Sequence, residues 1–180
     1  MTARLLLLAT LLFTAACSQV TVNDYADRTP TLDPKVFFDG KLTAHGVIQN
    51  RSGKVIRSFN ADIIASWSDG IGTLDEDFLF DNGETDKRVW TLTPDGSGGY
   101  TGRAGDVVGD GKLSFAGNAM FLDYVLRIPY GDGTVDVRVD DRMYLVEPGV
   151  LMNESRMSKF GVGVGKILLT IVRHPQTEVR

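Results

Sequence analysis

The strongest constraint on the fold is an alternation of apolar and polar residues with a period of two. The alternation runs through residues 38–49 and resumes in residues 55–67. In the first segment Leu42, Ala44 and Ile48 share one face, and polar side chains occupy the other. A period of two is typical of β-strands that bury one face, whereas an α-helix repeats about every 3.6 residues. Both segments are therefore predicted to be strands, and the short Gly-containing link between them predicts a hairpin.

Turn signals divide the remainder of the chain into segments of strand length. They are rich in Asp, Asn, Pro and Gly, and they fall at residues 68–70, 81–83, 94–99, 109–111, 131–133 and 148–149. The strands predicted between them cover residues 71–80, 87–93, 99–104, 112–128, 134–147, 150–158 and 166–174. A single helical turn is predicted at residues 33–37. The whole pattern indicates an antiparallel meander of about nine or ten strands.

A long antiparallel meander has two edge strands whose backbone groups need partners. Closing the sheet into a barrel removes both edges. We therefore predict an all-β fold in which the meander closes into a β-barrel, formed by a single domain of residues 33–180. A two-sheet β-sandwich is the alternative. Barrels of about eight strands have interiors that are filled by side chains or hold one small ligand.

The N-terminus has the features of an export signal. Arg4 is followed by an apolar run at residues 5–13, by small residues and then by Cys17. The apolar run is too short to span a bilayer, and the order of charge, apolar run and small residues is that of a signal peptide, residues 1–16. Cys17 is the only cysteine and resembles the acylated cysteine of the bacterial lipobox. An ordinary secretory signal beside an unrelated cysteine is the alternative.

The lipobox resemblance implies a lipid-anchored protein of the bacterial cell envelope. Cys17 would become the mature N-terminus and carry acyl chains such as palmitate, and two or more chains give stable anchoring. Residues 17–32 are predicted to be this lipidated N-terminus and a flexible tether, because they are polar and show no period. Ser18 stands where lipoproteins of the inner membrane often carry Asp. The resemblance therefore implies the outer membrane, facing the periplasm.

Composition and charge exclude several classes of partner and cofactor. The formal charge of −4 gives no basic stripe of the kind that nucleic-acid binding requires. One cysteine and two histidines cannot build a structural zinc site, a disulfide framework or a cysteine-ligated iron–sulfur cluster. The acidic residues between 75 and 86 lack the order of a calcium-binding loop. We expect no metal, no cofactor and no nucleic-acid partner.

Some polar residues share the parity of apolar neighbours in the predicted strands. This places them on the face that becomes the barrel interior, where a charge is costly unless it is paired. The candidate ligand-binding residues are Glu76, Arg88, Trp90, Asn118 and Asp141. They are predicted to form an internal ion-pair network, to receive the polar head of a ligand or, as the weakest alternative, to take part in catalysis. No catalytic residue is assigned.

The register of the hairpin near residue 82 decides which of these residues meet. We predict Phe80 opposite Arg88, which places Leu92 opposite Glu76. Glu76 and Arg88 would then be separated along the strands, and Asp141 becomes the candidate partner of Arg88.

Many of these segments resemble a family of bacterial lipoproteins known as a domain of unknown function, DUF3833. The matching segments are Phe37-Phe38-Asp39-Gly40, Ala44-His45-Gly46, Leu74-x-Glu76-x-Phe78-x-Phe80-Asp81-Asn82-Gly83, Arg88-x-Trp90, Ala104-x-Asp106-Val107-Val108-Gly109, Gly117-Asn118-Ala119, Asp140-Asp141-Arg142-Met143-Tyr144-Leu145, Met157-x-Lys159-Phe160-Gly161 and Val164-Gly165. The resemblance implies a lipocalin-like barrel and an association with fatty-acid and lipid-modification genes. It implies no established activity.

The sequence therefore favours a lipid-anchored binding module for an apolar small molecule such as a fatty acid or lipid. An interaction or structural lipoprotein with a filled barrel, no ligand and an envelope protein as partner is the first alternative. A lipid-modifying enzyme is the second and weaker alternative, because no catalytic pair can be named.

Overall fold

The computed structural model describes residues 19–175. Its elements are the 3-10 helix η1 (Val22–Tyr25), the helix α1 (Pro34–Phe37) and the strands β1 (Gly40–Asn50), β2 (Val55–Ser68), β3 (Ile71–Phe80), β4 (Thr85–Pro94), β5 (Tyr100–Arg103), β6 (Gly111–Ala116), β7 (Ala119–Tyr130), β8 (Gly133–Glu147), β9 (Val150–Lys159) and β10 (Val162–Arg173). Cys17 and the predicted signal peptide lie outside the described residues.

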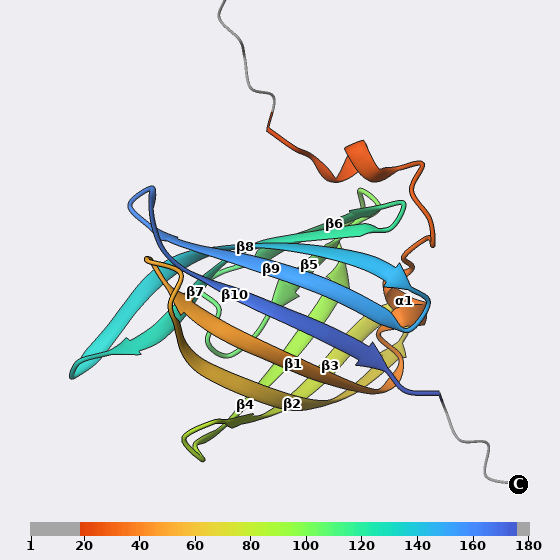
Figure 1. The fold of residues 1–180 in the computed structure, drawn as a ribbon. Helices are drawn as coiled ribbons and strands as arrows, with labels where there is room; N and C mark the ends of the chain where they lie inside the picture. Colours follow the sequence, from red (N-terminus) through yellow and green to blue (C-terminus); the bar gives the residue numbers. More distant parts are fainter. Residues whose placement is uncertain (1–18, 176–180) are drawn as a thin grey trace, which may run out of the picture.

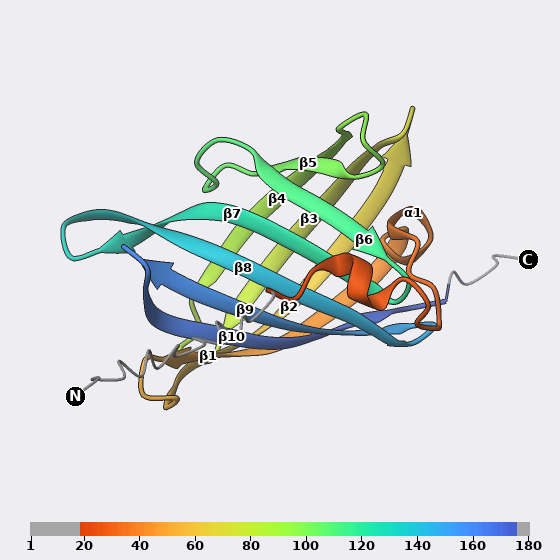
Figure 2. The ribbon, with the colours of Figure 1, turned by 90° about the horizontal axis from the view of Figure 1, so that it is seen from above.

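The strands form one closed antiparallel barrel (Figures 1 and 2). Each strand pairs with its neighbours in sequence, and β1 closes the sheet by pairing with β10 from Leu42↔Arg173 to Asn50↔Gly165. The prediction of an all-β barrel is confirmed, and the sandwich is excluded because the sheet has no open edge. All ten strands lie within residues 19–175, so this part of the chain carries a complete barrel with its own core.

The predicted parity places the core inside the barrel. Along β2, Phe59, Ala61, Ile63 and Ala65 are buried while the residues between them are not. Side chains from other strands complete the core, among them Leu42, Leu74, Trp90, Leu92, Leu113, Met120, Leu122, Tyr124, Leu126, Val137, Val139, Leu145 and Leu151. Among residues 19–175, no helix has the length and apolarity needed to cross a membrane.

Helix α1 closes one end of the barrel, in agreement with the helical turn predicted at residues 33–37. The helix begins at Pro34, and the side chain of Asp33 accepts a hydrogen bond of 2.9 Å from the backbone N–H of Lys35. Phe37 and Phe38 are buried, and the Trp67 indole donates to the Phe38 carbonyl at 2.7 Å. The β1–β2, β3–β4, β7–β8 and β9–β10 hairpins lie at the opposite end, away from α1 (Figures 1 and 2).

The structure divides the strand predicted at residues 112–128 into β6 and β7. Ala116 pairs with Ala119, so the two residues between them form the hairpin turn. Gly117 occupies this turn with φ +53°, a conformation that favours glycine. The prediction of one continuous strand was wrong here, and Asn118 consequently lies in a turn.

The segment predicted to be a flexible tether contacts the barrel instead. The Tyr25 ring packs against Phe121 and Tyr144, with ring centroids 5.9 Å and 5.1 Å away. Further along, Leu32 is buried, and its N–H donates to the Gly117 carbonyl at 2.7 Å. The prediction is therefore corrected for the part from Tyr25 onward, because the Tyr25 ring packs against side chains of β7 and β8 and Leu32 joins the buried core.

The close approach of this segment to Gly117 gives a first prediction. A Cβ at position 117 would overlap the carbonyl oxygen of Tyr25, whereas a Cβ at Gly131, which has a similar φ of +56°, meets nothing within 4 Å. Gly131→Ala should therefore lower the free energy of unfolding by only about 1 kcal/mol, the cost of placing alanine in the left-handed conformation. Gly117→Ala should cost more and release the segment, making tryptic cleavage after Arg28 about tenfold faster than in Gly131→Ala. Equal cleavage rates would contradict this.

Candidate functional site

A cavity of about 1450 Å³ occupies the barrel interior and opens between the hairpins. In barrels of about eight strands, side chains can fill the interior. The cavity of this ten-stranded barrel is large enough to hold a small molecule. Its walls are mainly apolar, with Ala44, Ile63, Leu126, Val137 and Leu169 among the lining residues. The barrel is therefore not filled, and an apolar molecule can be accommodated in it.

The structure corrects the predicted register of the β3–β4 hairpin. Glu76 lies directly opposite Arg88, where Leu92 was predicted, and Leu74 lies opposite Trp90. The chain turns within residues 81–83, because the Asn82 side chain accepts from the Glu84 N–H at 3.1 Å and Phe80 already bonds to Glu84. Glu76 and Arg88 are therefore neighbours rather than separated residues.

Arg88 forms a forked ion pair with Asp106, not with the predicted Asp141. Its Nε donates to both carboxylate oxygens at 3.1 Å and 3.0 Å, and its Nη2 donates to Oδ2 at 2.6 Å. The Arg88 and Asp106 side chains keep exposures of 22% and 34%. Asp106 reaches Arg88 from the loop between β5 and β6, so this loop is tied to the wall of β4.

Glu76 is an unusual acid because it lies inside the cavity wall. Burial raises its pKa from an ordinary 4.5 to about 7, against the lowering effect of the Arg88 charge. The negative charges of Asp106, Asp141 and Asp75 raise the pKa further. A large fraction of Glu76 is therefore protonated near neutral pH.

A second group of polar side chains lies on β7, β8 and β9, where Asp141 and Asn153 are 5% and 7% exposed. The Asn153 amide donates to Ser155 Oγ at 3.1 Å, and Asp141 pairs in register with Ser155. Burial raises the pKa of Asp141 to about 6, and hydrogen bonds from Ser155, Asn153 and Tyr124 together with the Arg88 charge oppose the rise. Within the described residues, Asp141 Oδ1 and Asn153 Oδ1 have no hydrogen-bond partner.

Trp90 and Tyr124 connect the two polar groups. Their rings meet edge to face, with centroids 5.3 Å apart and an interplanar angle of 89°. Trp90 follows Arg88 on β4, and Tyr124 lies on β7 beside Val139 of β8. Burial, together with the Asp141 charge, raises the pKa of Tyr124 well above its ordinary value, so Tyr124 keeps its proton and remains a hydrogen-bond donor.

Four of the five predicted ligand-binding residues, Glu76, Arg88, Trp90 and Asp141, line the one cavity. Asn118 does not, because its turn position directs its amide to the Leu145 carbonyl at 3.2 Å. The prediction of Asn118 as a cavity residue was therefore wrong. Four further residues line the cavity and are absent from the predicted site: Asp106, Tyr124, Asn153 and Ser155.

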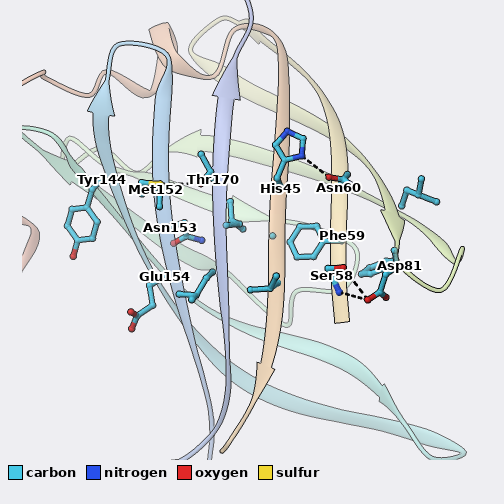
Figure 3. Close-up of a pocket in the computed structure, with 16 residues that line it drawn as sticks. His45, Ser58, Phe59, Asn60, Asp81, Tyr144, Met152, Asn153, Glu154 and Thr170 are labelled. Atoms are coloured by element: carbon cyan, nitrogen blue, oxygen red, sulfur yellow. Dashed lines mark hydrogen bonds between the residues drawn. The ribbon is translucent and has the colours of Figure 1, made fainter. Parts of the chain in front are cut away.

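A shallower hollow of about 700 Å³ lies on the wall formed by β9, β10, β1 and β2 (Figure 3). Four of its polar side chains pair with one another: His45 Nδ1 and Asn60 Oδ1 are 2.7 Å apart, and Ser58 Oγ donates to Asp81 at 3.1 Å. The exposed position of His45 agrees with its polar parity in the sequence. In residues 19–175, no group of His, Cys, Asp or Glu is arranged to hold a metal ion.

The closed meander, the capped end and the open interior define a lipocalin-like β-barrel protein. The chain matches the family described as "Protein of unknown function (DUF3833)" over residues 11–173, and it belongs to that family. The resemblance drawn from its sequence segments is thus confirmed. No curated protein matches the chain.

Solved structures resemble this chain at low sequence identity. The S-type phycobiliprotein lyase CPES from Guillardia theta is 14% identical, with a TM-score of 0.57, over 88% of this chain and 96% of the lyase. A de novo designed fluorescence-activating β-barrel is 10% identical, with a TM-score of 0.41, over 79% of this chain and 99% of the design. The likeness to the lyase concerns the fold alone.

Proposed function

We propose that this protein is a lipoprotein of the bacterial envelope that binds an apolar small molecule, a lipid or lipid-like chain, inside its barrel. Acylated Cys17 would hold it on the outer membrane, facing the periplasm. The observation that carries the binding role is the cavity of about 1450 Å³, which is open at one end, apolar along its walls and polar in its depth. Such a combination is typical of small-molecule sites, where few polar groups orient an otherwise apolar ligand.

The rim of the cavity is suited to the entry of such a molecule. Phe160 in the β9–β10 hairpin is 94% exposed, and Tyr130 and Ile56 on the neighbouring hairpins are also exposed. Tyr130 and Ile56 belong to the cavity lining as well, so the apolar surface continues from the rim into the interior. A lipid-like chain can therefore enter along this apolar surface, beside the charged rim residues Arg57 and Glu84.

The alternative of a filled barrel without ligand has less support, because the interior is not filled. The alternative of a lipid-modifying enzyme has a buried acid, Glu76, opposite Arg88, and a hydroxyl, Ser155, that donates to Asp141, but no observation favours a catalytic role over binding. We keep binding as the proposed function.

Filling the cavity tests the proposal. Ala61 lines the interior of β2, and Ile64 on the same strand points outward and is exposed. Ala61→Trp should weaken the uptake of a neutral fluorescent probe such as Nile red by the barrel of residues 19–180 at least about tenfold, because the indole occupies the space that the ligand needs. Fluorescence titration measures the affinity, and Ile64→Trp should leave it unchanged.

A thermal melt confirms that the filled variant is folded, and Ala61→Leu is the milder substitution if the indole overpacks the wall. Native mass spectrometry of the purified barrel should additionally detect a retained apolar molecule. Equal uptake by wild type and Ala61→Trp would place the probe outside the barrel and contradict the proposal.

The anchor is tested separately. Cys17→Ser should release the protein from the membrane fraction, because the acylated cysteine is the proposed attachment. The melting temperature should stay within about 1 °C of that of the wild type, because the core lies within residues 19–175. Fractionation followed by a salt wash measures attachment. A variant that stays in the membrane fraction would show that another attachment exists.

A further inference from the structure

Two buried acceptors in the polar depth of the cavity have no hydrogen-bond donor within the described residues, although Ser155, Asn153 and Tyr124 donate to Asp141. Asp141 and Asn153 are both more than nine-tenths buried and both line the cavity. Each has one side-chain oxygen without a partner in the described part of the chain. The Asn153 amide nitrogen is already engaged with Ser155. A buried acceptor without a donor is unfavourable, so this part of the wall calls for a group that supplies N–H or O–H.

Arg88, a half-buried cation of this region, does not supply the missing donor. Arg88 donates with both Nε and Nη2 to Asp106, which neutralises it. Glu76 lies directly opposite Arg88 and adds another carboxyl group. A carboxylate ligand would therefore meet three acidic side chains, Glu76, Asp106 and Asp141, and an arginine that is already paired.

We propose that the cavity selects an apolar ligand whose head donates hydrogen bonds, a hydroxyl, amide or amine, and that Asp141 Oδ1 and Asn153 Oδ1 accept from this head. The inference rests on the proposed function and narrows its ligand class: an ionised fatty acid is disfavoured, and a neutral or cationic chain with a donor group is favoured. The apolar wall around Leu126 and Val137 then contacts the chain.

Burial distinguishes this head site from the mouth of the barrel. Asp141 lies between Val139 and Met143 on the inner face of β8, and all three residues are buried. The charged side chains at the rim, such as Arg57 and Glu84, pair with one another. The head of the ligand is therefore expected in the depth of the cavity, with the chain extending toward the hairpins.

The test compares ligands that share a chain and differ only in the head. Dodecanol, dodecylamine, dodecanoate and dodecyl methyl ether compete with Nile red for the barrel of residues 19–180 at about pH 8, where the acid is ionised and the amine charged. Dodecanol and dodecylamine should displace the probe at about tenfold lower concentration than dodecanoate, and at about fivefold lower concentration than the ether. Comparing dodecylamine with dodecanol shows whether a positive charge on the head increases the affinity beyond the effect of the hydrogen-bond donor.

Two substitutions locate the preference. Asp141→Leu and Asn153→Leu should each remove the preference for dodecanol over the ether, while affinity for the ether is kept. Met152→Leu is the matched control, because Met152 is the outward-facing neighbour of Asn153 and is exposed. It should leave the order of ligands unchanged.

The outcomes separate the inference from the proposed function. Equal displacement of Nile red by dodecanol and the ether would mean that only water donates to the buried acceptors. Tighter binding of dodecanoate would mean that the site prefers an anionic head. Either result overturns the inference and leaves the proposed function standing. A preference that survives in both leucine variants would place the head elsewhere and also overturn it. A barrel that binds neither Nile red nor any of these chains would overturn the proposed function, and the inference with it.

Discussion

Replacing Arg88 with methionine should lower the free energy of unfolding by about 3 kcal/mol, at the low end of the range for breaking a buried ion pair. The substitution leaves Asp106 without its forked partner and Glu76 without the cation opposite it. The partial exposure of the two side chains, 22% and 34%, keeps the loss from being larger. Urea unfolding of the two proteins measures the difference.

The molecule contains a matched control for this substitution. Arg127 makes the same forked contact with Asp136, with Nε–Oδ1 2.8 Å and Nη2–Oδ2 3.0 Å, but its side chain is 51% exposed. Arg127→Met should therefore cost at most about 1 kcal/mol. The double variant Arg88→Met with Asp106→Leu should recover most of the loss, because an apolar pair replaces a stranded acid. Equal losses for Arg88→Met and Arg127→Met would mean that the inner pair is no more structural than the outer one.

The direction of the cavity side chains could be predicted because it is a local property. In a strand, parity alone decides which face a residue occupies, so Glu76, Arg88 and Trp90 were assigned to the interior from their apolar neighbours. Asn153 and Ser155 carried the same signal, since they share parity with the apolar Leu151 and Met157 of β9. They could have been found by the same reasoning.

The contacts between strands could not be predicted with the same certainty, because they depend on turns and loops. The β3–β4 register required the length of the turn after Phe80, and Asp106 lies in a loop without any period. The β6–β7 turn did leave a signal. Apolar parity changes from odd at Leu113 and Phe115 to even at Met120, which a single regular strand cannot contain. The sequence contains no signal for the contact of Tyr25 with the barrel, because an isolated aromatic residue in a polar segment does not reveal its partner.

Raising the pH from about 5 to about 8 should destabilise the barrel through its buried acids, by at least about 2 kcal/mol. Glu76 has a pKa of about 7 in the folded protein and an ordinary value of 4.5 when unfolded. Between these values the unfolded chain releases a proton that the folded chain keeps, so stability falls as the pH rises, and it levels off once folded Glu76 is also ionised. The full shift corresponds to about 3 kcal/mol, and the water in an open cavity reduces it. Asp141, with a pKa of about 6, acts in the same direction at lower pH.

Comparing variants assigns this pH dependence to Glu76. The charged and titratable groups that interact electrostatically with Glu76 are Arg88, Asp106, Asp141, Asp75 and the Tyr124 hydroxyl. Glu76→Gln removes the titrating group while keeping its size, so it should match the wild type at about pH 5 and be the more stable protein by about 2 kcal/mol at about pH 8. Glu154→Gln is the control, because the hydrogen bond from Arg156 lowers the pKa of Glu154, which is therefore ionised throughout this range. Urea unfolding of the three proteins at each pH provides the values, and parallel curves for wild type and Glu76→Gln would show that Glu76 is ionised in the folded barrel across the whole range.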